Sequence, residues 1–128
     1  MKNINRLATN DSPDINFDET KRTLTIVGNS YPENCEPLYE PIKSFLDHYD
    51  VEENNMLNFN FHFNLINSTS VVYLAQIIVK VAGLAKEGLS VFIRWKYDEY
   101  DEEMLDLGEK LSSISKLPIE YVPIKDED

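Results

Sequence analysis

The sequence is poor in the residues on which most small enzymes and metal-binding domains depend. Its 128 residues include one cysteine (Cys35), two histidines (His48 and His62) and four scattered glycines. A single thiol cannot form an internal disulfide, and one cysteine with two histidines cannot complete a structural zinc site. Without clustered glycines there is no phosphate-binding loop, and no serine, histidine and acid set is evident. We therefore expect a non-enzymatic protein that needs no cofactor or metal.

Basic residues are also scarce. Twelve Lys and Arg face 23 Asp and Glu, which gives a formal net charge of −11. This balance argues against nucleic-acid binding and against docking on anionic lipid, because both depend on basic side chains. For binding to another protein, this negative charge would favour a partner with a basic surface.

Long apolar runs and targeting signals are absent as well. The longest apolar stretch, 71–85, is interrupted by Gln76 and Lys80, and we expect it to be too short to span a bilayer. Residues 1–13 are polar and have no apolar segment typical of a signal peptide. The expected cellular location is the cytoplasm.

What is present indicates one α/β domain, because the length and the 42% hydrophobic content are ordinary for such a domain. We expect a flexible N-terminal arm (1–13), a single domain (14–124) and a solvated acidic tail (125–128). The arm is rich in polar residues and offers little to bury.

The clearest element is a strand over 57–65, where apolar residues alternate with Asn58, Asn60, His62 and Asn64. Such alternation predicts a sheet covered on one face only. Shorter strands are predicted around Ile15 and Phe17, at 23–27 with an end at Gly28, at 89–97 and at 119–124.

Helical spacing of apolar residues predicts three helices between these strands. The first runs to about Tyr49 and either begins near Pro41 or is kinked there, because proline disrupts a helix beyond its first turn. The second covers 71–86, and the third has Met104, Leu107, Leu111 and Ile114 on its inner side. The order β-β-α-β-α-β-α-β predicts a mixed sheet with helices packed on one face.

Three unusual loops follow the parallel strands and should share one edge of the sheet: 28–34, 67–70 and 97–101. In the last, the carboxylates from Asp98 to Glu103 lack the spacing of a calcium loop and are better explained as favourable charges at a helix start. Cys35, beside another helix start, is more simply a structural thiol than a reactive one.

The run Asn67-Ser68-Thr69-Ser70 has two compatible interpretations. Each of its side chains can cap the following helix. A phosphate on one of these hydroxyls would lie beside the unpaired N–H groups of the first helical turn while changing the surface that a partner meets.

This run belongs to a wider pattern that also contains Ser30-Tyr31-Pro32-Glu33-Asn34 and Trp95-Lys96-Tyr97-Asp98-Glu99. Over 14–123 the chain resembles the SiaC family of bacterial regulatory phosphoproteins. The family fold is similar to STAS domains, the fold of anti-sigma-factor antagonists, so the resemblance implies a STAS-like sheet.

The resemblance implies a regulatory adaptor without catalysis of its own. A kinase phosphorylates the hydroxyl directly after the Asn of the motif, a phosphatase removes the phosphate, and the unmodified form binds a signalling protein such as a diguanylate cyclase or an anti-sigma-type kinase. By position the acceptor is Ser68, with Thr69 as the alternate. Asn67 would shape the turn and Ser70 would help to cap the helix.

Other residues of the same edge are expected to serve this switch. The loop that holds Ser30, Tyr31, Glu33 and Asn34 would contact the partner or order the acceptor. Further contact residues are expected beside it: Val72, Tyr97 and Asp98. We also expect Arg94 or Lys96 to reach the phosphate.

Two alternatives use the same edge. A small-ligand sensor would need a deep pocket under Tyr31 and Tyr97. A cryptic metal-dependent enzyme would need a cation site around Asp98 and the carboxylates that follow it.

Overall fold

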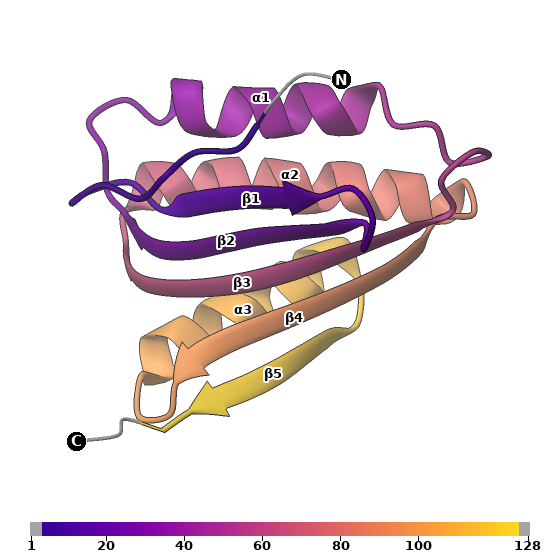
Figure 1. Ribbon diagram of the computed structural model, residues 1–128. Coiled ribbons are helices and arrows are strands. Elements are labelled where there is room, and N and C mark those ends of the chain that lie inside the picture. The colour runs from indigo at the N-terminus through magenta and orange to yellow at the C-terminus, as the bar shows by residue number, and fades with distance from the viewer. Residues whose placement is uncertain (1–3, 126–128) are drawn as a thin grey trace.

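The computed structural model describes residues 4–125 (Figure 1) and contains one five-stranded sheet with the strands in chain order. Strand β1 pairs antiparallel with β2, and β2, β3, β4 and β5 run parallel. The elements are β1 (Asp14–Asp18), β2 (Thr23–Ser30), α1 (Glu36–Asp47), β3 (Met56–Ile66), α2 (Ser68–Lys86), β4 (Ser90–Asp98), α3 (Glu102–Ser115) and β5 (Ile119–Ile124). The mixed α/β architecture and its element order are confirmed, whereas the STAS-like label stays a prediction.

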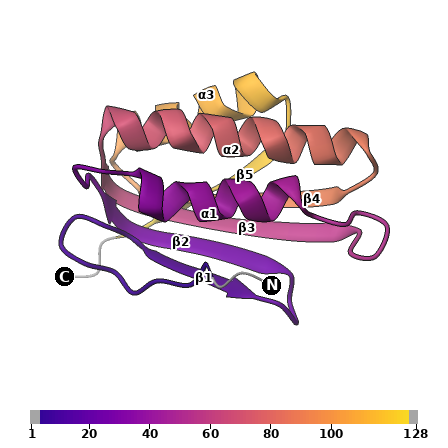
Figure 2. The same ribbon diagram turned by 90° about the horizontal axis from the view of Figure 1, so that it is seen from above.

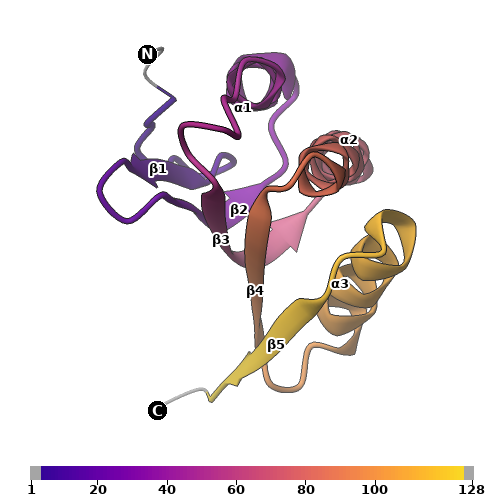
Figure 3. The same cartoon turned by 90° about the vertical axis from the view of Figure 1, so that its right-hand side faces the viewer.

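All three helices lie on one face of the sheet, as Figure 3 shows with α1 and α2 seen nearly end-on. Strand β3 explains this arrangement, because Phe59, Phe61 and Phe63 are buried while Asn58 and Asn60 lie on the other face. The three rings stack along the strand, and Trp95 of β4 contacts two of them. The core is therefore a single layer between sheet and helices.

Strand β2 extends further than the sequence indicates. Gly28 does not end it, because pairing with β3 resumes at Ser30 after a local irregularity. Gly28 has φ +125°, a conformation that residues with a Cβ rarely adopt, so the glycine allows the irregularity without ending the strand. The extra residues bring Ser30 to the end of the sheet.

Helix α1 begins at Glu36 and contains Pro41 in its interior, so its start is earlier than Pro41. A proline at this position cannot donate the usual bond to the carbonyl oxygen of Pro37, four residues earlier. Arg6 Nη1 donates to that oxygen instead, at 2.6 Å. A side chain from outside the helix thus satisfies the acceptor that the proline leaves free.

The predicted N-terminal arm is in part a packed segment, which corrects the expectation for residues 4–13. Ile4 is buried in the core, and the backbone of Arg6 pairs with Ile15 through two hydrogen bonds of 2.8 and 2.9 Å. Two further bonds hold this polar stretch: Phe17 N–H donates to Asn5 Oδ1 at 2.7 Å, and Tyr31 N–H donates to the carbonyl oxygen of Asp11 at 2.8 Å. Residues 1–3 and 126–128, the rest of the predicted arm and tail, lie outside the described residues.

Helix α2 is longer than predicted, with 19 residues, and by length and composition alone it could cross a membrane. The expectation that this stretch is too short was therefore wrong. The helix packs on the sheet, and its inward residues are buried in the core: Leu74, Ile77, Ile78 and Val81. A core helix of this kind meets the same length and composition criteria as a membrane span.

Helix α3 follows the predicted pattern except at its end, where Ile114 is exposed and Ser115 is buried. Gly108 faces Trp95 so closely that a Cβ added there would lie 2.7 Å from the Trp95 ring. The glycine lets the helix approach the indole, whose Nε1 donates to the carbonyl oxygen of Met104 at 2.9 Å.

Candidate functional site

The carboxyl ends of the parallel strands meet at one edge of the molecule, as predicted. Figures 1 and 2 show the loops that follow β2, β3 and β4 leading into the N-termini of α1, α2 and α3 along this edge. The N-terminal amides of each helix have no partner within the helix, so each N-terminus carries a partial positive charge. Acidic side chains stand in the first turn of α1 (Glu36) and of α3 (Glu102 and Glu103), whereas the first turn of α2 has none.

The predicted acceptor turn begins α2. Asn67 is the N-cap, and its Oδ1 accepts the Ser70 N–H at 2.9 Å. Ser68 and Thr69, the first two helical residues, are both exposed. The predicted role of Asn67 in shaping the turn thus has a physical basis, and two hydroxyls are accessible beside unpaired amides.

Ser70 does not cap the helix, which corrects our expectation. It is fully buried, and its Oγ lies 2.8 Å from Ser30 Oγ and 3.3 Å from Cys35 Sγ. Ser30 Oγ also lies 2.5 Å from the hydroxyl oxygen of Tyr39. We call these four residues the hydroxyl cluster.

Sequence reasoning missed Tyr39 and the burial of Ser70, although the sequence carried a signal. Residues 68 and 70 lie about 200° apart around a helix. If one hydroxyl faces solvent, the other must face the core. Burial raises the pKa of the Tyr39 phenol, which therefore remains a neutral hydrogen-bonding group.

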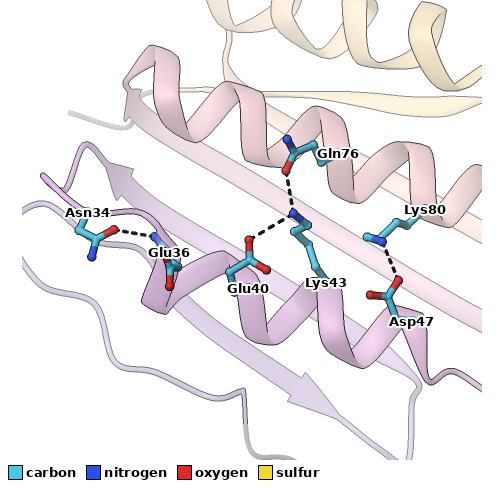
Figure 4. Close-up of polar contacts among 7 residues, drawn as sticks. All are labelled: Asn34, Glu36, Glu40, Lys43, Asp47, Gln76 and Lys80. Carbon is cyan, nitrogen blue, oxygen red and sulfur yellow. Dashed lines mark hydrogen bonds and ion pairs between the residues drawn. The ribbon is translucent and has the colours of Figure 1, made fainter.

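The loop after β2 lies against the acceptor turn. The Asn67 N–H donates to the carbonyl oxygen of Ser30 at 2.9 Å, and the Asn67 side chain donates to Pro32 at 3.4 Å. Asn34 accepts the Glu36 N–H at 3.2 Å near the start of α1 (Figure 4). Tyr31, Glu33 and Asn34 are exposed. The structure therefore places this loop against the turn that precedes Ser68.

The residues at the end of β4 make other contacts than the expected ones with a partner or a phosphate. Tyr97 is half-buried, packed against the core, and Asp98 Oδ1 lies 3.2 Å from Nε2 of His62. Arg94 and Lys96 alternate with the inward-facing Ile93 and Trp95, so they lie on the open face of the sheet.

Because α2 lies on the opposite face, the structure does not bring Arg94 or Lys96 to Ser68. Arg94 is paired instead with Glu120, with Nε and Oε1 3.3 Å apart. The expectation of a phosphate contact overlooked the strict alternation of strand side chains.

The outer side of α2 carries an uncovered apolar strip. Val72 and Val79 are 54% and 52% exposed, and Val79 lines a shallow hollow of about 400 Å³ together with Ala75 and Gln76. Figure 4 shows its polar rim, where Lys43 contacts Glu40 and Gln76 and bridges α1 to α2. Val72 lies four residues after Ser68, on the same side of the helix.

Two observations bear on the alternative functions. Within residues 4–125, neither Tyr31 nor Tyr97 lines any of four surface hollows of about 210 to 490 Å³. Within the same residues, no group of three His, Cys, Asp or Glu side chains is placed to hold a metal ion. The predicted pocket and the predicted cation site therefore gain no support.

The five-stranded sheet with three helices on one face defines the class as a small mixed α/β domain. The chain matches the family model described as SiaC family regulatory phosphoprotein over residues 7–124. The chain therefore belongs to the SiaC family, which confirms the predicted family and agrees with the expectation of a non-enzymatic protein.

Individual proteins resemble the chain in sequence and in fold. The chain is 23% identical over 118 residues to an uncharacterized protein of Pseudomonas aeruginosa (strain UCBPP-PA14), covering 92% of this chain and 94% of the relative. It superposes on apo-SiaC from Pseudomonas aeruginosa with a TM-score of 0.79 at 22% identity, covering 95% and 99% of the two chains. SiaC in its complex with the diguanylate cyclase SiaD, which it activates, gives 0.79 at 23% identity, covering 91% and 96%.

Proposed function

We propose that this chain is a cytoplasmic adaptor whose binding to a signalling partner is switched by phosphorylation of Ser68, with Thr69 as the alternate acceptor. A Ser/Thr kinase and a phosphatase set the modification. The partner is a diguanylate cyclase, a choice supported by the complex of the relative SiaC with SiaD. The observation that carries the proposal is the turn that exposes two hydroxyls at the start of α2 and buries the third.

The geometry supports a switch of this kind. A phosphate on Ser68 would carry about −1.5 to −2 charges beside the free amides of the first turn, which favour an anion. The chain would therefore accept the modified state without unfolding. For a partner seated on the exposed Val72, the same phosphate would introduce charge and bound water one helical turn away.

Phosphosite mass spectrometry on the protein from its native cells tests the modification. We expect phosphate on Ser68 or Thr69 and its loss in the matching variant, Ser68→Ala or Thr69→Ala. Ser113→Ala, at an exposed serine of α3, is the control and should leave the phosphate in place. Phosphate found only at other sites under several growth conditions would contradict the proposal.

Binding to the purified diguanylate cyclase of the same cell tests the surface. Val72→Asp and Ser68→Asp should each weaken binding about tenfold or more, since charge placed within an apolar contact is poorly tolerated. Phe92→Asp is the matched control, because Phe92 is similarly exposed (58%) but lies on the other face of the sheet. Equal losses from Val72→Asp and Phe92→Asp would exclude α2 as the binding surface.

A further inference from the structure

The hydroxyl cluster brings together side chains from three elements that meet beneath the acceptor turn. Ser30 ends β2, Cys35 and Tyr39 belong to the start of α1, and Ser70 lies in the first turn of α2. All four side chains are buried, between 0% and 2% exposed. Buried polar groups of this kind are costly unless every donor has an acceptor.

One arrangement of protons satisfies the whole cluster. Ser70 O–H donates to the carbonyl oxygen of Ser30 at 3.1 Å. Ser30 O–H then donates to Ser70 Oγ, Tyr39 O–H donates to Ser30 Oγ, and Cys35 S–H donates to Ser70 Oγ. Each group donates once, and no oxygen accepts more than two bonds, which is within its capacity.

The carbonyl oxygen of Ser30 is the common point of attachment. It accepts the backbone N–H of Asn67 at 2.9 Å and the side-chain hydroxyl of Ser70 at 3.1 Å. These two donors flank Ser68 and Thr69 on either side. The exposed segment is therefore held at both ends by one atom of β2, while the Asn67 cap joins the two ends directly.

We propose that Ser30, Ser70 and Tyr39 are positioning residues that hold Ser68 and Thr69 in the geometry required for their modification. Ser70 keeps the third hydroxyl out of reach and fixes the rotation of the helix. Ser30 and Tyr39 hold Ser70. This role rests on the proposed function, since it concerns the same acceptor. It also links the exposed loop from Tyr31 to Asn34 mechanically to the acceptor turn.

Hydrogen exchange of the full, unmodified chain tests positioning without a kinase. Ser70→Ala and Tyr39→Phe should each accelerate exchange of the Asn67, Ser70 and Val71 amides about fivefold, the effect of one lost hydrogen bond. Tyr39→Phe keeps the ring that stacks on Tyr73 and removes only the hydroxyl.

Ser115→Ala is the matched control for this experiment. Ser115 is another buried serine, bonded to the carbonyl oxygen of Leu111 at the far end of α3. Its loss should change overall stability but leave the three amides of the acceptor turn as they are. Equal acceleration in Ser115→Ala and Ser70→Ala would overturn the positioning role.

Phosphate occupancy in native cells tests the consequence. In Ser70→Ala and Tyr39→Phe we expect occupancy at Ser68 and Thr69 to fall about tenfold, because displacement of a reacting group by about 1 Å slows a reaction by up to ~100-fold. The ratio of Ser68 to Thr69 should also shift, which general destabilisation would not cause. Occupancy and ratio equal to those of Ser115→Ala would contradict the proposal.

The two proposals fail in different ways. Wild-type chains without phosphate on either residue would refute the phosphorylation switch, whatever the exchange rates. Phosphorylated wild-type chains with unchanged occupancy in Ser70→Ala would refute the positioning role and leave the switch intact.

Discussion

The two faces of the sheet are made by alternate residues of the same strands, and their environments are opposite. On the covered face of β3, Phe59, Phe61 and Phe63 are fully buried beneath the helices. On the open face, one row crosses all five strands and contains Asn16, Thr25, Asn60, Arg94 and Glu120. The row contains amide and hydroxyl groups and both signs of charge. Its side chains make few contacts, so a substitution here should remove little stabilising free energy.

The two faces should therefore differ in how much they contribute to the stability of the fold. Burial of apolar area drives folding, so the covered face should account for most of the free energy of unfolding. The edge at the carboxyl ends of the parallel strands combines the two environments. There polar side chains are buried in the hydroxyl cluster, whereas the apolar side chain of Val72 is left exposed.

The largest predicted effect compares neighbours on β3. Phe61→Ala should lower the free energy of unfolding by about 3–5 kcal/mol, because the ring is buried and contacts both adjacent phenylalanines and Trp95. Asn60→Ala, one residue away on the open face, should change it by about 0.5 kcal/mol or less. Urea unfolding followed by circular dichroism measures both, and similar losses would remove the distinction between the faces.

The second prediction applies the comparison to the inner and outer sides of the helices. Gly108→Ala should destabilise the fold by about 1–3 kcal/mol, because the new methyl group would overlap the Trp95 ring. Gly83→Ala, on the outside of α2 with open space around it, should stabilise by up to about 1 kcal/mol through helix propensity. Thermal unfolding of the two variants should shift in opposite directions, and shifts of the same sign would contradict the assignment.

Patterns with a strict period could be predicted from the sequence, and contacts between distant segments could not. The alternation in β3 gave the one-sided sheet, because strand side chains alternate whatever their neighbours. The start of α1 was ambiguous because the cost of Pro41 depends on Arg6, which is 35 positions earlier and satisfies the free carbonyl oxygen. Nothing local to Pro41 indicates that partner.

The candidate site shows the same limit. The exposed hydroxyls at Ser68 and Thr69 followed from the motif and the helix start. The burial of Ser70 depends on Ser30 and Tyr39, which come from β2 and α1. The predicted phosphate contact of Arg94 is wrong because Arg94 lies near this edge but on the open face of the sheet, away from α2.

The third prediction concerns charge on the open face. Arg94 and Glu120 are both largely exposed, so their ion pair should contribute about 0.5 kcal/mol or less. A double-mutant cycle with Arg94→Ala and Glu120→Ala measures the coupling, and 0.5 M salt should reduce it further. A coupling above about 1.5 kcal/mol would show that the open face is more structured than its exposure indicates.

The smallest effect is predicted on the outside of the helix layer, where Asp47 of α1 and Lys80 of α2 form an exposed pair with Oδ1 and Nζ 2.6 Å apart (Figure 4). The hydrogen bond from Lys80 lowers the pKa of the Asp47 carboxyl below its usual value of 3.8. The ionised carboxylate therefore stabilises the fold above pH 3.8, and this contribution disappears as the pH falls through the lower pKa of the folded state. Asp47→Asn should lower Tm slightly at neutral pH. It should have no effect at a pH below the folded-state pKa of Asp47, where the carboxyl is protonated. The difference should shrink in a Lys80→Met background to the smaller contribution of the His48 and Lys43 charges, and a difference of unchanged size there would assign the effect to a contact other than this pair.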